Sequence, residues 1–231
     1  MAGVWAVVVA AGSGVRFGGP KQFAVLAGTR VVDRSLAVAR DACDGVVLVL
    51  TDPEAWDGAH ADVVVTGGAT RADSVRAGLA AVPADADVVV VHDAARPLAG
   101  PGLYAAVVAA VRAGADGAIP GLPVADTLKR VDSGASGASG ASGASGGAGG
   151  SVIAGTVDRD DLVAAQTPQA FRADVLRAAH ASGGDATDDA ALVEAHGGKV
   201  VVVPGDPRNL KLTGPRDLAV AEALLHHGHD A

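Results

Sequence analysis

The sequence has one cysteine, few aromatic residues and fewer basic than acidic side chains. The single cysteine, Cys43, excludes an internal disulfide and fits a reducing cytosol, and we interpret it as a small buried hydrophobic residue. Aromatic residues make up 3% of the chain, so the core has to be packed mainly from aliphatic side chains. The formal net charge of -8 argues against a general binder of nucleic acids or acidic membranes, because such proteins usually carry a basic surface. Any phosphate site is then a local positive patch on an acidic protein.

Long apolar runs are also missing from the sequence. No stretch approaches the roughly 20 apolar residues of a membrane helix. The apolar run at residues 4–9 has no Lys or Arg before it and is followed at once by a glycine-rich segment, which is unlike a signal peptide. We therefore expect a soluble, cytoplasmic protein. Its 231 residues suffice for one large domain and do not require a second.

Valine-rich runs recur along the chain, with segments of helical periodicity between most of them. The runs are continuous instead of alternating, which is typical of strands that are covered on both faces. We predict an α/β fold, a three-layer sandwich with a mostly parallel, Rossmann-like sheet. The predicted strands are 4–9, 46–50, 63–65, 88–91 and 200–203, and the predicted helices are 31–42, 74–81, 101–113, 174–181 and a last one with Thr213 as N-cap and Pro215 in its first turn.

Residues 10–23, AAGSGVRFGGPKQF, place four glycines in fourteen positions directly after the first predicted strand. Glycines let the main chain approach a ligand and direct several N–H groups at it, as phosphate-binding loops do. Arg16 and Lys21 are placed to neutralise the same phosphates. The loop is not a P-loop, and Phe17 stands where a dinucleotide fingerprint requires glycine. The alternative interpretation is an ordinary surface turn.

Further polar motifs follow the other predicted strands, at the edge where sheets of this kind bind ligands. Residues 66–74, TGGATRADS, would form a pocket wall for a nucleobase, or alternatively a helix N-terminus without a ligand. Residues 92–97, HDAARP, put Asp93 at a strand end, where a carboxylate is costly unless it meets a metal, a cation or a hydroxyl. Arg96 is placed to bind a phosphate, whereas His92 is interpreted as a packing or supporting residue. Lys211 follows the last strand and is either a site residue or a solvated strand position.

Residues 133–150 consist almost entirely of Gly, Ala and Ser. Such a segment cannot bury enough apolar surface to order itself, so we predict a flexible tip. Its flanks, 126–131 and 152–159, alternate as the two strands of a β-ribbon would. We predict one domain over residues 1–231, with a protruding β-arm at about 124–159; an interdomain linker is the alternative.

The sequence resembles nucleotidyltransferases that keep an Ala-Ala-Gly-x-Gly-x-Arg loop ending in Pro-Lys. It is similar in particular to the 2-C-methyl-D-erythritol 4-phosphate cytidylyltransferase family of the non-mevalonate isoprenoid pathway, because the loop, Arg159 and the Thr-Pro-Gln segment at 167–169 occur in the family's order over residues 4–225. The long tip and Ala69, where many relatives carry an acidic residue, differ from the family pattern.

The resemblance implies transfer of CMP from CTP to 2-C-methyl-D-erythritol 4-phosphate, giving 4-diphosphocytidyl-2-C-methyl-D-erythritol and pyrophosphate. It further implies Mg²⁺ as cofactor, with Asp93 as the candidate metal ligand, and a homodimer in which the β-arm reaches the partner. The implied catalytic residues are Arg16, Lys21, Arg159 and Lys211. The implied CTP-binding residues are Ala10, Ala11, Gly12, Ser13, Gly14, Gly67, Gly68, Arg71, Ser74 and Asp93. The implied acceptor-binding residues are Arg96, Thr127, Thr167 and Thr187, although the last lies in a sequence that would also cap a helix.

Three other functions are compatible with parts of the sequence. A cytidylyltransferase for another polyol phosphate, such as ribitol 5-phosphate, would share the nucleotide half of the site. A non-catalytic nucleotide-binding homologue is disfavoured by Arg16, Lys21 and Asp93. An NAD-linked dehydrogenase is favoured by the glycine loop and by Asp52 after the second strand, but disfavoured by the glycine spacing.

Overall fold

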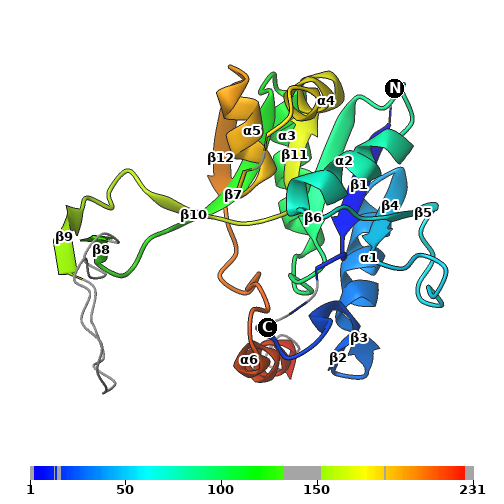
Figure 1. Ribbon diagram of the computed structural model, residues 1–231, viewed down its shortest axis with the longest axis horizontal. Coiled ribbons are helices and arrows are strands. Elements are labelled where there is room, and N and C mark those ends of the chain that lie inside the picture. The colour runs from blue at the N-terminus through cyan, green and yellow to red at the C-terminus, as the bar shows by residue number, and fades with distance from the viewer. Residues whose placement is uncertain (1–2, 13, 15–16, 133–151, 185, 227–231) are drawn as a thin grey trace, which may run out of the picture. The chain divides into compact units, whose positions relative to one another are not determined.

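A computed structural model describes residues 3–12, 14, 17–132, 152–184 and 186–226 (Figure 1). Ser13, Arg16 and the predicted tip at 133–150 lie outside the described residues. The chain divides into two compact units, one made of Met1–Gly121 and Ala165–Ala231 and the other of Leu122–Ala164. The expectation of a single domain over 1–231 stays a prediction.

The first unit is built on a mostly parallel sheet, as the valine runs predict. Within the described residues the strand order is β10-β7-β11-β6-β1-β4-β5, and β12 pairs with β7. The pairs β1–β4, β1–β6, β4–β5 and β7–β12 are parallel, whereas β11 is antiparallel to both of its neighbours. The strands are β1 (Val4–Val9), β4 (Gly45–Leu50), β5 (Val63–Thr66), β6 (Val88–Asp93), β7 (Gly117–Pro123), β10 (Val163–Ala165), β11 (Gln169–Arg172) and β12 (Val200–Pro204).

All five predicted strands of this sheet are confirmed, but β7, β10 and β11 were not predicted. β7 has the sequence GAIPGLP. Glycine and proline are depleted in strands, so this segment has the composition of a loop. β11 has four residues, QAFR, too few to show a periodicity. The sheet therefore contains an antiparallel strand that the sequence pattern does not indicate.

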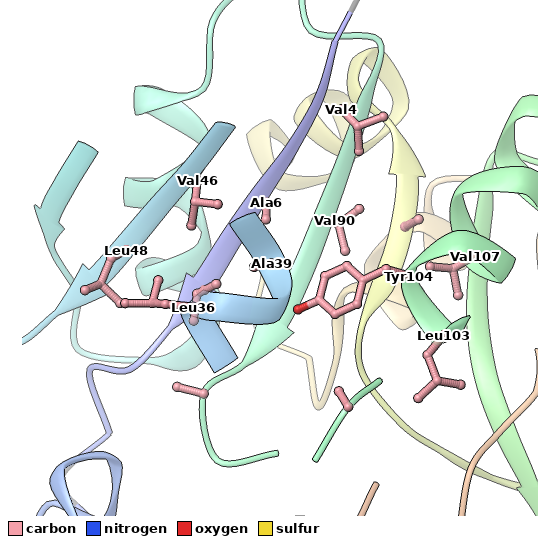
Figure 2. Packing of buried hydrophobic residues seen from close by; sticks show 14 of the residues in the cluster. Val4, Ala6, Leu36, Ala39, Val46, Leu48, Val90, Leu103, Tyr104 and Val107 are labelled. Atoms are coloured by element: carbon pink, nitrogen blue, oxygen red, sulfur yellow. The ribbon is translucent and has the colours of Figure 1, made fainter. Parts of the chain in front are cut away.

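Helices cover both faces of this sheet, which explains why the valine runs do not alternate. In β1, Val4, Ala6 and Val8 belong to the core beneath α1 and α3, whereas Val7 belongs to the core beneath α2, α4 and α5. Figure 2 shows the first of these cores, where Tyr104 lies among aliphatic side chains of the sheet and of α1. The helices are α1 (Val31–Ala42), α2 (Arg71–Ala81), α3 (Pro101–Arg112), α4 (Ala173–Ala181), α5 (Asp189–Ala195) and α6 (Pro215–His226).

Two predicted helix starts are corrected. α2 begins at Arg71 instead of residue 74, because Thr70 and Asp73 form a capping box: each side chain accepts the backbone N–H of the other. The start of α6 is not capped by Thr213. The carboxylate of Asp217 instead accepts the backbone N–H groups of Thr213 and Gly214.

A small hairpin and a third apolar cluster complete this unit. The turn η2 (Lys21–Phe23) leads into the hairpin of β2 (Val25–Leu26) and β3 (Thr29–Arg30). Leu26 and Val31 pack with Leu212 and Ala221 in this cluster. The cluster therefore ties the glycine-rich N-terminal loop to the C-terminal segment that carries Lys211.

The second unit, Leu122–Ala164, contains the predicted ribbon. β8 (Leu128–Asp132) pairs antiparallel with β9 (Val152–Val157), and an irregularity interrupts the register between Arg130 and Val131. Every residue of β8 is exposed, so the ribbon is not held by burial within its own unit. None of the helices in the described ranges is long and apolar enough to cross a membrane.

Candidate functional site

A pocket of about 380 Å³ lies at the carboxyl ends of β1 and β6. Its walls come from four chain segments that the sheet brings together: the loop after β1, the start of α2, the loop after β6 and the segment before α6. It is lined by Val9, Ala10, Ala11, Gly12, Lys21, Gln22, Gly68, Ala69, Thr70, Arg71, Ser74, Asp93, Ala94, Ala95 and Lys211.

The register of the sheet fixes this arrangement. Val9, the last residue of β1, is level with Asp93 on β6 and with Val49 on β4. Beyond the strand ends, the N–H of Ala10 donates to Val49 and the N–H of Ala94 donates to Val9. Because parallel strands end at one edge, motifs that are far apart in the sequence converge there.

The two glycines after β5 have different positions. Gly68 lines the pocket, whereas Gly67 does not. A Cβ at Gly67 would collide with the Cβ of Ala11 and lie 2.9 Å from Oγ of Ser74. Gly67 therefore allows the loop after β5 to pack against the loop after β1. Gly14, which has a φ of 65°, is likewise not part of the pocket lining.

Asp93 forms the centre of a charged wall on one side of the pocket. Its Oδ1 accepts from Nε of Arg71 at 3.1 Å and its Oδ2 accepts from Nζ of Lys211 at 2.6 Å. Burial alone would raise the pKa of Asp93, but the charges of Arg71 and Lys211 outweigh it and hold the pKa well below its usual range. Asp93 is therefore ionised throughout the neutral pH range.

Arg71 is held between two carboxylates. Its Nη1 donates to Oδ2 of Asp189 at 2.8 Å, and Oδ1 of Asp189 lies 3.0 Å from Nε2 of His180. Burial alone would lower the pKa of Arg71, but the charges of Asp93 and Asp189 raise it above its ordinary value. Its Nη2 is buried and has no hydrogen-bond partner within the described part of the chain.

Lys21 and Gln22, which also line this pocket, donate to backbone carbonyls. Nζ of Lys21 donates to the carbonyl of Leu212 at 2.8 Å, and Nε2 of Gln22 donates to the carbonyl of Gly12 at 3.1 Å. Lys21 thus joins the turn η2 to the chain next to Lys211. Gln22 was not predicted as a site residue, because nothing in the sequence around it distinguishes it from a surface residue.

A second pocket of about 210 Å³ shares Arg71, Asp93 and Lys211 with the first. The charged wall therefore has a pocket on each side. The other residues that line the second pocket are Arg96, Ala165, Gln166, Thr167, Gln169, Thr187 and Asp188. Three predicted acceptor-binding residues, Arg96, Thr167 and Thr187, are thus brought together.

A buried hydrogen-bond network supports the second pocket. Oγ1 of Thr167 accepts the N–H of Asp93 at 3.1 Å and lies 3.1 Å from Nδ1 of His92. Arg96 donates to the carbonyl of Asn209, whose side chain donates to the carbonyl of Thr167. Burial lowers the pKa of His92 to about 4, so this imidazole is neutral at neutral pH. Its contact with Thr167 agrees with the interpretation of His92 as a packing or supporting residue.

The predicted site residues Thr127 and Arg159 belong to the other unit, Leu122–Ala164. Nη1 of Arg159 donates to the carbonyl of Ala125 at the base of the ribbon. The predicted cap of α5 is also present, since Asp188 accepts the N–H of Ala191. Sequence reasoning missed Asp189 and His180, because no pattern in the chain relates them to Arg71.

Comparison with known proteins places the site in a family. The family of 2-C-methyl-D-erythritol 4-phosphate cytidylyltransferase, IspD, matches residues 4–227. The enzyme of that name from Nocardia farcinica is 46% identical over 96% of this chain and 94% of its own length. The one from Rhodococcus jostii is 44% identical over 97% of this chain and 96% of its own length.

Solved structures agree with the sequence comparison. The crystal structure of 2-C-methyl-D-erythritol 4-phosphate cytidylyltransferase from Thermus thermophilus superposes with a TM-score of 0.76 at 35% identity, covering 95% of this chain and 98% of that one. With the sequence match, the sheet topology and the paired pockets at its edge, these findings show that the chain belongs to the 2-C-methyl-D-erythritol 4-phosphate cytidylyltransferase family.

Proposed function

We propose that this protein transfers CMP from CTP to 2-C-methyl-D-erythritol 4-phosphate, releasing pyrophosphate and 4-diphosphocytidyl-2-C-methyl-D-erythritol. The observation that carries the proposal is the charged wall of Arg71, Asp93 and Lys211, which has a pocket on each side. A transferase for two anionic substrates needs two adjacent compartments with cations at their boundary. Membership of the family supplies the identity of both substrates.

The larger pocket is the proposed CTP site. It is lined by residues 10–12 of the glycine-rich loop and by the start of α2. A helix N-terminus favours negative charge, and so do Lys21 and Lys211 at the rim. Arg16 belongs to the same loop in sequence, and we assign it to the triphosphate together with Lys21.

The smaller pocket is the proposed acceptor site. Thr167 and Thr187 offer hydroxyl groups for a polyol, and Arg96 offers a cation for its phosphate. Asp93 borders both pockets. Each of its oxygens accepts from one cation, and we propose that a remaining lone pair accepts a hydrogen bond from a substrate hydroxyl. These assignments fit a short polyhydroxylated chain that carries one phosphate.

The proposed reaction needs little acid or base chemistry. The acceptor phosphate is already an anion, and it attacks the α-phosphorus of CTP in line while pyrophosphate leaves. Catalysis then consists of holding the two anions in line and stabilising the charge that develops on the transferring group. The cations Lys21 and Lys211 serve this purpose, and no nucleophilic side chain is required.

Mg²⁺ is proposed to enter as part of the CTP substrate. The described residues contain no group of three or more His, Cys, Asp or Glu side chains arranged to hold a metal ion. Both oxygens of Asp93 are hydrogen-bonded to cationic groups, so Asp93 does not present a free carboxylate. Mg²⁺ is commonly held mainly by substrate phosphates with one or two carboxylates, and this residue set fits that arrangement better than a protein-made site.

We further propose a cytoplasmic homodimer in which the ribbon delivers Arg159 and Thr127 to the acceptor pocket of the partner. The exposure of every residue of β8 supports this, because its apolar members Leu128 and Val131 are not covered within their own unit. A partner surface would cover them. Arg159 would then contribute a further cation for the acceptor phosphate.

The test is a direct assay of group transfer. Purified protein is incubated with CTP and Mg²⁺ and with either 2-C-methyl-D-erythritol 4-phosphate or ribitol 5-phosphate, and products are followed by ³¹P NMR and pyrophosphate release. We expect a diphosphodiester product with the first acceptor and at most a minor rate with the second. Preference for ribitol 5-phosphate would reassign the acceptor. CTP binding without any turnover would leave a nucleotide-binding homologue instead of an enzyme.

A further inference from the structure

Arg71 is connected to a pair of buried side chains that line neither the CTP pocket nor the acceptor pocket. Asp189, in the first turn of α5, accepts from Nη1 of Arg71 at 2.8 Å, and His180, in the last turn of α4, lies 3.0 Å from its other oxygen. The polar chain therefore runs from His180 through Asp189 and Arg71 to Asp93. It joins three helices to the end of β6.

Asp189 is an unusual carboxylate because its side chain is only 1% exposed. A buried charge is unfavourable unless its oxygens are paired and hydrogen-bonded. One oxygen of Asp189 accepts from Arg71 and the other contacts His180, so both oxygens have a hydrogen-bond partner. Its orientation, and with it the direction in which it holds the guanidinium, is fixed by these two partners.

His180 contributes a defined hydrogen bond to this arrangement. A carboxylate only accepts, so Nε2 of His180 carries the proton and donates to Asp189. The ring is 3% exposed, and its Nδ1 has no partner among the residues that the structure describes. Among the described residues, Asp189 is therefore the hydrogen-bond partner of this buried ring.

We propose that His180 and Asp189 are positioning residues for the CTP site, holding Arg71 so that its guanidinium stays against Asp93 and faces the pocket. The inference rests on the proposed function, because Arg71 is assigned there to CTP. Arg71 lines both pockets, and its buried Nη2 has no partner in the described chain. Without His180, the freed oxygen of Asp189 would draw the guanidinium toward itself and away from Asp93.

The test is a double-mutant cycle read out by CTP binding. His180→Leu removes the donor but keeps the apolar volume, and we expect it to weaken CTP binding about threefold to tenfold in calorimetry. His180→Gln keeps an N–H near the position of Nε2 and should restore binding to within about twofold of the wild type. In an Arg71→Met background, His180→Leu should have almost no further effect, because the residue through which it acts is gone.

One control variant separates positioning from packing. Arg177→Met alters the same helix at a side chain that donates to the carbonyls of Val82 and Pro83 instead of to Asp189, and it should lower the melting temperature without changing CTP affinity. If His180→Leu does not fold, His180→Asn replaces it as the variant whose amide cannot reach Asp189.

The outcomes are distinct. Unchanged CTP affinity in the folded His180→Leu or His180→Asn variant would overturn the inference while leaving the proposed function intact. So would an equal loss in the wild-type and Arg71→Met backgrounds. A wild-type protein that does not bind CTP would overturn the proposed function itself, and this inference with it.

Discussion

Nζ of Lys211 lies 2.6 Å from Oδ2 of Asp93, although 118 positions separate the two residues in the sequence. Asp93 ends a central strand, and Lys211 follows the edge strand β12 at a loop that returns to the same side of the sheet. The pair forms part of the wall between the two pockets. A cation is thereby fixed between the proposed positions of two anionic substrates, and it is itself held by a carboxylate.

Asp93→Asn should destabilise the protein by about 3 kcal/mol at pH 7, since it leaves Arg71 and Lys211 without their shared carboxylate. The pKa of Asp93 is depressed in the folded state. Its ionised form therefore stabilises the fold above the unfolded value of about 3.9, and this contribution is lost as the pH falls through the folded pKa. Urea unfolding at several pH values should show the difference between variant and wild type shrinking below that value. Asp85→Asn, at an exposed residue, is the control. An equal loss of stability in this variant would argue against the pairing of Asp93 with Arg71 and Lys211.

Lys21→Ala should lower kcat by about 10² to 10³ with a modest change in KM, by analogy with the loss of one donor to a transition state. Lys21 reaches across to the carbonyl of Leu212, so it is held at the rim of the pocket before substrate binds. Steady-state pyrophosphate release measures the effect. Lys199→Ala, an exposed lysine outside both pockets, should be unchanged. An unaltered kcat in Lys21→Ala would remove Lys21 from the mechanism.

Gly67→Ala should weaken CTP binding by about tenfold or more, because the new methyl group cannot fit between Ala11 and Ser74. The loop after β1 would be pushed into the pocket or away from it. Gly102→Ala is the matched control: a Cβ there meets no atom within 4 Å on the exposed face of α3, so binding should not change. Titration calorimetry with CTP distinguishes the two. Equal affinities for both variants would show that the close approach of these loops is unimportant.

Much of the fold follows from one chemical pattern. The valine runs are continuous because both faces of the strands are covered, as Val7 and Val8 illustrate by packing under helices on opposite faces. A parallel sheet also determines where the site lies, because the carboxyl ends of neighbouring strands, such as Val9 and Asp93, are level at one edge. Segments after the strands then meet at one edge, and Lys211 joins them there.

Other features have no local signal in the sequence. β11 lies antiparallel between β6 and β7 because the chain returns through the segment Leu122–Ala164, and four residues are too few to indicate this. The contact of Asp189 with Arg71 and His180 joins the ends of three helices. Such contacts depend on tertiary packing, so neither periodicity nor a motif identifies them.

Mixing Arg159→Ala with Lys21→Ala tests the proposed exchange of ribbons. If each site combines Lys21 of one chain with Arg159 of the other, a mixed dimer has one intact site, and an equimolar co-expressed mixture should regain about one quarter of wild-type activity. Each variant alone should be nearly inactive with limiting acceptor. If both residues act within one chain, the mixture gains nothing over the separate variants.

A second mixture is the control for that experiment. Wild-type chain paired with the Lys21→Ala/Arg159→Ala double variant forms mixed dimers without an intact site when the ribbons are exchanged. In an equimolar mixture, activity should then fall to about half of that expected from the wild-type chains alone. Activity in proportion to the wild-type chains would place Lys21 and Arg159 in the same subunit's site.

His92→Gln should flatten the pH dependence of stability between about pH 4 and pH 6.5. Burial lowers the pKa of His92 to about 4 in the folded state, so in this range the unfolded chain binds a proton that the native protein does not. Stability therefore falls as the pH decreases, by on the order of 3 kcal/mol for this group. In urea unfolding, the His92→Gln variant should not show this pH-dependent loss of stability. The His60→Gln variant, which changes an exposed ring, should still show it. An unchanged slope in His92→Gln would mean that the ring behind Thr167 is not held neutral by burial.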